Sequence, residues 1–78
     1  MINLGVTKQK ILVELKGEPK HGYEIGKSLS LNTSTVYEHM EDLEDQDFVE
    51  SDRSEGSEGK INYNLTEKGR KIVEALEM

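Results

Sequence analysis

The chain has 78 residues and no cysteine, so we expect one small domain held by packing, without disulfides or a zinc site built on thiolates. Only 33% of the residues are hydrophobic, which supports a modest core and makes a second copy of the chain the expected stabilising partner. No apolar run is long enough to span a membrane and no signal peptide is recognisable, so we expect a soluble cytoplasmic protein without membrane contact.

The net charge of −6 at pH 7 is unevenly distributed along the chain. Residues 1–31 carry five Lys and three Glu, whereas residues 32–53 carry eight acidic residues and one Arg. Double-stranded DNA is a dense polyanion, so this acidic segment argues against contact with DNA unless its carboxylates point elsewhere. The acidic residues are Glu38, Glu41, Asp42, Glu44, Asp45, Asp47, Glu50 and Asp52.

The N-terminal part of the chain predicts a strand and two helices. Alternating apolar residues from Ile2 to Val6 favour a short strand, and Thr7 can cap a helix over residues 7–16 that ends at Gly17. A second, short helix is predicted over residues 21–29. It contains two glycines, which weaken a helix by about 1 kcal/mol each and therefore indicate close backbone packing. The glycines are Gly22 and Gly26, and the residues that support the two helices are Ile11, Leu12, Leu15, Tyr23, Ile25 and Leu29.

The third predicted helix has the clearest pattern in the chain. Asn32 or Thr33 can cap it, and it continues to about Asp45. Its apolar positions follow the spacing i, i+4, i+7, which predicts one buried face. These positions are Val36, Met40 and Leu43.

Beyond Asp47 the apolar pattern changes from helical to alternating. Two strand-like runs, residues 48–53 and 60–65, flank a loop of turn-forming residues at 54–59, which predicts a hairpin. Thr66 can cap a last helix, which Gly69 interrupts early. The apolar face of that helix consists of Ile72, Val73 and Leu76.

Six short motifs follow one another along the chain: Ile11-Leu12 through Leu15, His21-Gly22-Tyr23-Glu24-Ile25, Ser34-Thr35-Val36-Tyr37, Leu43-Glu44, Phe48-Val49-Glu50 and Tyr63-Asn64-Leu65-Thr66-Glu67-Lys68-Gly69. In this order and spacing they resemble the PadR-like winged-helix transcription regulators over about residues 9–76. The resemblance implies a fold of the α+β class, mainly helical, in which residues 1–78 form a single winged helix-turn-helix domain. Such a domain has a three-helix core, a two-stranded hairpin wing and a short C-terminal helix.

The same resemblance implies a repressor that binds double-stranded DNA as a homodimer. The third helix, about 33–45, would enter the major groove, and the wing, about 49–65, would flank it. The sequence departs from the family where Glu41-Asp42 replaces residues that are commonly basic, and where Asp47 replaces a usual glycine. Many relatives also carry a long additional C-terminal helix that forms much of the dimer, whereas this sequence ends at Met78.

The candidate DNA contacts begin with the first turn of the third helix, where neutral side chains can bond phosphates or base edges. Simple helix capping is the alternative for Thr33 to Thr35. The resemblance favours a phosphate contact over core packing for Tyr37. Two cations near the second helix and two beside the wing tip complete the set, although the latter two could merely offset neighbouring acids. The candidates are Asn32, Thr33, Ser34, Thr35, Tyr37, Glu38, Lys20, Lys27, Arg53 and Lys60.

The acidic half of the third helix leaves other interpretations open. It can be a solvated face that keeps the protein soluble, or it can bind a basic protein partner, which is the alternative function. The only imidazoles are His21 and His39, and His21 suits a structural role at a helix start. We therefore expect no enzyme activity, no cofactor and no metal.

Overall fold

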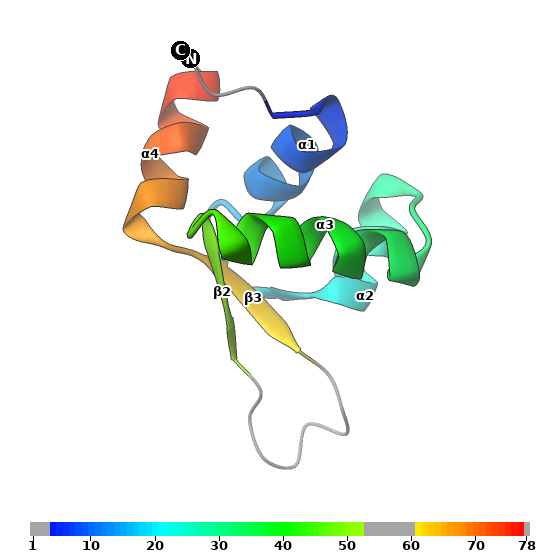
Figure 1. Ribbon diagram of the computed structural model, residues 1–78. Coiled ribbons are helices and arrows are strands. Elements are labelled where there is room, and N and C mark those ends of the chain that lie inside the picture. The colour runs from blue at the N-terminus through cyan, green and yellow to red at the C-terminus, as the bar shows by residue number, and fades with distance from the viewer. Residues whose placement is uncertain (1–3, 53–60, 78) are drawn as a thin grey trace.

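The computed structural model describes residues 4–52 and 61–77, which contain four helices and a small antiparallel sheet (Figure 1). None of the helices in these two stretches is long and apolar enough to cross a membrane. The elements are α1 (Val6–Glu14), β1 (Lys20–His21), α2 (Gly22–Leu29), α3 (Thr33–Asp45), β2 (Val49–Asp52), β3 (Asn62–Leu65) and α4 (Glu67–Leu76).

The core lies behind α3 and receives side chains from every helix. The predicted stripe on α3 is confirmed, because Val36, Met40 and Leu43 have no exposed surface. Ile11 and Leu12 from α1 and Ile25 from α2 are equally buried, as apolar residues at helical spacing require. The remaining core residues are Leu4, Leu15, Phe48, Val49, Tyr63, Leu65 and Val73.

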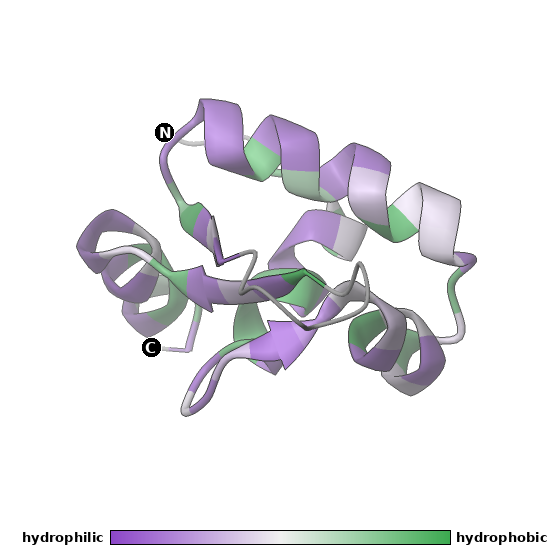
Figure 2. Cartoon of the chain, turned by 90° about the horizontal axis from the view of Figure 1, so that it is seen from below, coloured by the Kyte–Doolittle hydropathy of each residue, from purple (hydrophilic) through white to green (hydrophobic). Residues whose placement is uncertain are grey.

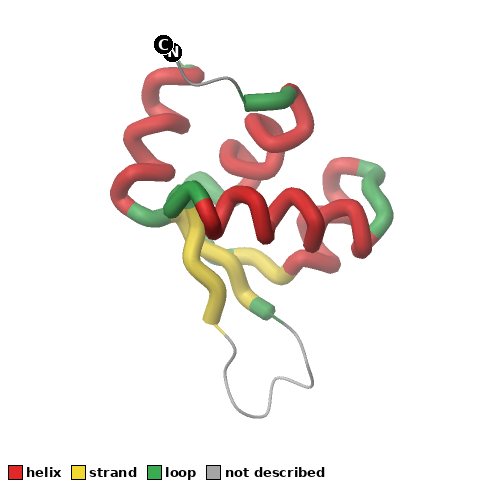
Figure 3. Tube along the Cα trace, in the orientation of Figure 1, coloured by secondary structure: helices red, strands yellow, loops and turns green. Residues whose placement is uncertain are grey.

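The three strands form a sheet of order β1-β3-β2, with both pairs antiparallel. Figure 3 shows β2 and β3, in yellow, extending away from the helices, whereas β1 leads into α2. Tyr63 in the central strand is opposite Lys20 of β1 and Ser51 of β2. The predicted hairpin is thus confirmed over Val49–Asp52 and Asn62–Leu65, whereas the rest of the predicted strands and the loop at 54–59 lie outside the described residues.

The prediction of a strand near the N-terminus was wrong. Val6 begins α1, and Leu4 joins the core without belonging to a strand; Ile2 lies outside the described residues. The third strand is instead β1, two residues long, which pairs with β3. The predicted cap at Thr7 was also wrong, because Gly5 precedes the helix in an extended conformation. Three alternating positions are too few to separate a strand from an extended lead into a helix.

Close backbone approaches explain glycines within the helices. A Cβ atom on Gly26 would lie 2.9 Å from the carbonyl oxygen of Leu31, which confirms the predicted tight packing at the turn between α2 and α3. A Cβ atom on Gly69 would collide with the carbonyl oxygen of Phe48. Asp47, which replaces the usual glycine of the family, adopts the left-handed conformation with φ of 65°. The turn before β2 therefore survives that replacement.

Thr66 fixes the start of α4 against the turn before β2. Its Oγ1 accepts a hydrogen bond of 3.0 Å from the backbone N–H of Gly69, which confirms the predicted cap. The same hydroxyl donates a hydrogen bond of 2.6 Å to the carbonyl oxygen of Asp47. One side chain thus joins α4 to the end of the α3–β2 turn.

Replacing Thr66 with Ala should lower the free energy of unfolding by about 1–2 kcal/mol, because it removes both hydrogen bonds of the hydroxyl. Urea unfolding followed by circular dichroism measures the change. Thr66→Ser keeps the hydroxyl and should retain most of the stability. Equal midpoints for the wild type and Thr66→Ala would contradict this role for the side chain.

Candidate nucleic-acid interface

The first turn of α3 presents neutral polar groups at the positive end of the helix dipole. Asn32 occupies the N-cap position with an extended backbone, but its side chain makes no capping hydrogen bond. The first N–H groups of the helix therefore lack a side-chain acceptor there. Ser34 is exposed, and Thr33 and Thr35 are partly exposed, so their hydroxyls accompany these N–H groups at the surface. This turn can hydrogen-bond an anion or the edge of a base.

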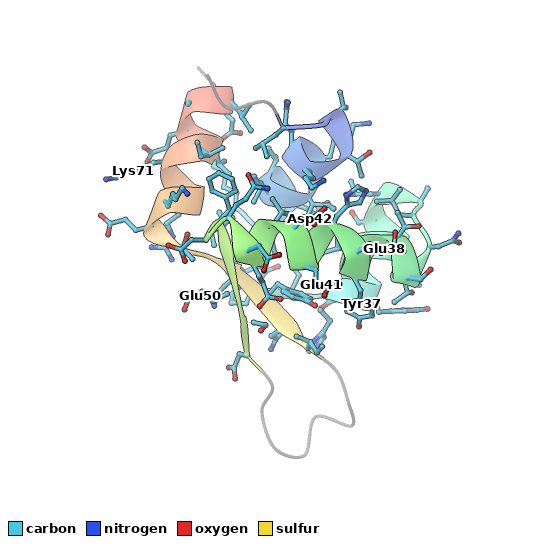
Figure 4. The ribbon with its side chains drawn as sticks, in the orientation of Figure 1. Tyr37, Glu38, Glu41, Asp42, Glu50 and Lys71 are labelled. Atoms are coloured by element: carbon cyan, nitrogen blue, oxygen red, sulfur yellow. The ribbon has the colours of Figure 1, made fainter. Side chains whose placement is uncertain are left out.

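Polarity changes sharply along α3. Figure 2 shows pale residues in its N-terminal half and strongly hydrophilic residues towards its C-terminal end. Glu38, Glu41, Glu44 and Asp45 are exposed. The acids do not all point away from the first turn, because Glu41 lies on the same side of α3 as Tyr37 (Figure 4). The spacing i, i+4 explains this placement.

Two acids of the segment are held by neighbouring elements. Asp42 pairs with Lys8 of α1 at 3.3 Å, and Glu44 accepts a hydrogen bond of 3.1 Å from the hydroxyl of Ser51 on β2. One of these carboxylates is thus paired with a cation, and the other is hydrogen-bonded within the protein. The exposed remainder still gives the C-terminal half of α3 a negative surface.

Tyr37 packs within the fold on two sides. Its ring lies over the bare Cα of Gly22, where an added Cβ atom would be 2.7 Å from its Cε1. It also contacts the ring of Tyr63, with centroids 6.3 Å apart and an interplanar angle of 49°. The side chain remains partly exposed. Packing against the core is thus observed, and the contact of its hydroxyl with a phosphate stays a prediction.

Only two of the four predicted cations lie within the described residues, and their surroundings differ. Lys20 is paired with Glu14 at 3.3 Å, and both side chains are about three-quarters buried, so its charge is used inside the fold. Lys27, in the last turn of α2, is exposed and makes no ion pair within residues 4–52 and 61–77. Arg53 and Lys60 lie outside the described residues.

The carboxylate of Glu14 joins α1 to α2 and β1. The hydroxyl of Ser28 donates a hydrogen bond of 2.8 Å to it, and the ammonium group of Lys20 donates one of 3.3 Å. The Ser28 hydrogen bond is the largest cause of a lowered pKa for Glu14, and Lys20 adds to it despite the opposing effect of burial. Lys20 is therefore a structural cation in this arrangement.

One exposed aromatic residue was missed in the sequence. Tyr23, at the start of α2, has 62% of its surface exposed, whereas Ile25 of the same helix is buried. From its spacing in the sequence, Tyr23 was assigned to the apolar positions of the helix. No local pattern distinguished it from a core residue. Its neighbour Gly22 was predicted to pack closely, and the packing partner is Tyr37.

The helices α2 and α3 followed by the hairpin β2–β3 define a winged helix-turn-helix domain, and solved structures share this fold. ZitR of Lactococcus lactis, a zinc-responsive MarR family member, superposes with a TM-score of 0.87 and 25% identity over 94% of this chain and 51% of that chain. FabT of Streptococcus pneumoniae in complex with DNA gives a TM-score of 0.88 and 22% identity over 96% of this chain and 53% of that one. AdcR of Streptococcus pyogenes gives a TM-score of 0.90 and 20% identity over 97% of this chain and 56% of that chain.

The chain belongs to the transcriptional regulator PadR-like family, whose sequence model matches residues 11–75. This confirms the resemblance seen in the sequence, and the family consists of transcriptional regulators, not enzymes. The HTH-type transcriptional regulator MJ0229 of Methanocaldococcus jannaschii is 48% identical over 59 residues. That match covers 74% of this chain and 62% of the relative, so the chain spans less than two thirds of the relative's length.

Replacing Glu14 with Gln should lower stability at neutral pH, because the carboxylate form is the one that the fold stabilises. A group whose pKa is lowered by folding contributes stability that is present above its ordinary pKa of 4.5 and is lost as pH falls through the lowered value. The difference between wild type and Glu14→Gln should therefore disappear in acid. Urea midpoints measured as a function of pH test this.

Glu18→Gln provides the control, since Glu18 is exposed and makes no hydrogen bond or ion pair within residues 4–52 and 61–77. The stability of the Glu18→Gln variant should equal that of the wild type at every pH. A deficit for Glu14→Gln that is as large in acid as at neutral pH would show that the charge of Glu14 is irrelevant.

Proposed function

We propose that this protein is a sequence-specific DNA-binding repressor that acts as a homodimer in the cytoplasm. The observation that carries the proposal is the first turn of α3, where neutral hydroxyl groups surround backbone N–H groups that no capping side chain occupies. An exposed helix start of this kind, within a winged helix-turn-helix domain, has the chemistry to enter a major groove.

In this proposal the residues divide by role. Asn32 and Ser34 bond to base edges or phosphates, and the methyl groups of Thr33 and Thr35 can contact thymine. Tyr37 donates a hydrogen bond to a phosphate, and Glu38, which follows it on α3, borders the contact.

Lys27 adds a cation beside the groove, and the wing, about 49–65, flanks the duplex with Arg53 and Lys60. Lys20 is the weakest of the proposed contacts, because Glu14 already neutralises it.

An apolar groove supports the homodimer. Val6, Val13 and Leu76 are exposed large hydrophobic residues that line a groove of about 450 Å³ between α1 and α4. These two helices lie at the end of the molecule opposite the hairpin (Figure 1). In a two-fold contact each copy would present this same apolar surface to the other. A second copy there leaves both α3 helices accessible.

The acidic half of α3 supports a second candidate function. Exposed carboxylates on this helix and Glu50 on β2 repel phosphate and attract cations. A winged helix that uses this face on a basic protein partner is the alternative, and the two functions differ in their response to duplex DNA.

Replacing Lys27 with Ala should weaken binding to a duplex selected from random sequences. It should also reduce the slope of log affinity against log salt by about one, because one phosphate contact is lost. Fluorescence titrations at several salt concentrations measure both quantities. Lys71→Ala removes the same charge from an exposed position of α4 and should leave the slope unchanged. Failure of the wild type to bind any duplex at low salt would overturn the proposal in favour of the protein partner.

Replacing Val13 with Asp should shift the protein from dimer to monomer, because the substitution puts a charge into the apolar groove. Sedimentation equilibrium measures the mass in solution. Gln46→Glu adds the same charge at the exposed C-terminal end of α3 and should leave the dimer intact. A wild-type chain that is monomeric at high concentration, or a Val13→Asp variant that remains dimeric, would show that this groove is not the contact.

A further inference from the structure

The Tyr37 ring of α3 lies directly against the backbone at the first residue of α2. A Cβ atom built on Gly22 would be 2.7 Å from Cε1, 3.1 Å from Cζ and 3.3 Å from Oη of Tyr37. Cβ atoms in proteins essentially never come within 3.0 Å of a neighbour, so only a hydrogen atom fits at Gly22 while the ring keeps this position. The hydroxyl end of Tyr37 is thus the part that a side chain at Gly22 would displace.

The backbone conformation of Gly22 does not itself require glycine. Its φ lies outside the left-handed region, in contrast to the φ of 101° at Gly17. Glycine within a helix costs about 0.5–1 kcal/mol relative to alanine, so local stability favours alanine at this position. The space needed by Tyr37 is the feature of the fold that requires glycine here.

The second contact of Tyr37 is with the sheet that leads into the wing. Tyr63 is 3% exposed and lies in the central strand β3, opposite Lys20 and Ser51 of the two flanking strands. The Tyr37 and Tyr63 rings meet with centroids 6.3 Å apart. Tyr37 therefore contacts both the start of α2 and the base of the wing.

Tyr37 also lies one helical turn after the residues that we propose for base contact. Thr33 and Tyr37 are four residues apart on α3 and share one side of the helix. A change in χ1 of Tyr37 moves its hydroxyl relative to Thr33.

We propose that Gly22 is a positioning residue for DNA recognition, which acts by leaving space for Tyr37. The bare Cα of Gly22 lets the Tyr37 ring settle between α2 and Tyr63, with its hydroxyl placed for a phosphate at the edge of the groove. This inference rests on the proposed function, since it assigns to Gly22 an effect on a DNA contact.

Replacing Gly22 with Ala tests the proposal through DNA affinity measured on fully folded protein. The affinity for the selected duplex should fall about tenfold, the size expected when a hydrogen bond to a charged group is lost. Gly5→Ala is the matched control, because nothing lies within 4 Å of a Cβ atom at Gly5. That variant should bind as the wild type does. Gly22→Ala that binds like the wild type would overturn the inference.

Tyr37→Phe separates positioning from a merely structural role, because it removes the hydroxyl and keeps the ring. It should bind about tenfold more weakly with little change in stability, and Gly22→Ala/Tyr37→Phe should bind no more weakly than Tyr37→Phe alone. Losses that simply add in the double variant would contradict an action of Gly22 through the Tyr37 hydroxyl.

If Gly22→Ala does not fold, Gly22→Ala/Tyr37→Leu provides the decisive variant, because leucine vacates the space that the new methyl group needs. The inference requires that folding returns while duplex affinity remains reduced, and wild-type affinity in this variant would overturn it. A wild-type protein that binds no duplex would instead contradict the proposed function itself. A wild type that binds with steep salt dependence, beside a Gly22→Ala variant of equal affinity, would contradict only the role of Gly22.

Discussion

Burial of one face of α3 determines what this small domain presents to its surroundings. Val36, Met40 and Leu43 have no exposed surface, and they lie along one side of the helix. Turning α3 would expose this apolar area at a cost of about 25 cal/mol for each Å². The helix is therefore fixed in rotation, and the same packing that completes the core sends Ser34 and Glu41 to the surface.

Ion pairs between elements use several of the cations that a DNA-binding surface would otherwise display. Lys8 pairs with Asp42, Lys16 with Glu77 and Lys20 with Glu14. Of these ion pairs, the exposed one between Lys16 and Glu77 contributes little to stability, generally below about 1 kcal/mol. The pairs have a larger consequence for the proposed recognition of DNA, in which contact through α3 would depend on hydrogen bonds and the helix dipole more than on positive charge.

Sequence patterns predicted the elements with long apolar periodicity and missed those that tertiary pairing creates. The stripe from Val36 to Leu43 located α3 closely, and the hydroxyl of Thr66 located the start of α4. Lys20-His21 carries no apolar alternation, so β1 exists through its pairing with β3. The first turn of α3 was predicted from its residue types. The neutralisation of Lys20 by Glu14 was not, because it depends on how the loop between α1 and β1 folds back.

The central claim is that the neutral first turn of α3, and not its acidic half, meets the nucleic acid. Amide chemical-shift mapping of the labelled protein, titrated with a selected duplex at low salt, tests this most directly. We predict the largest changes at Thr33 to Tyr37, with small changes from Glu41 to Asp45. Changes confined to the acidic half, or no changes on addition of duplex, would contradict the claim.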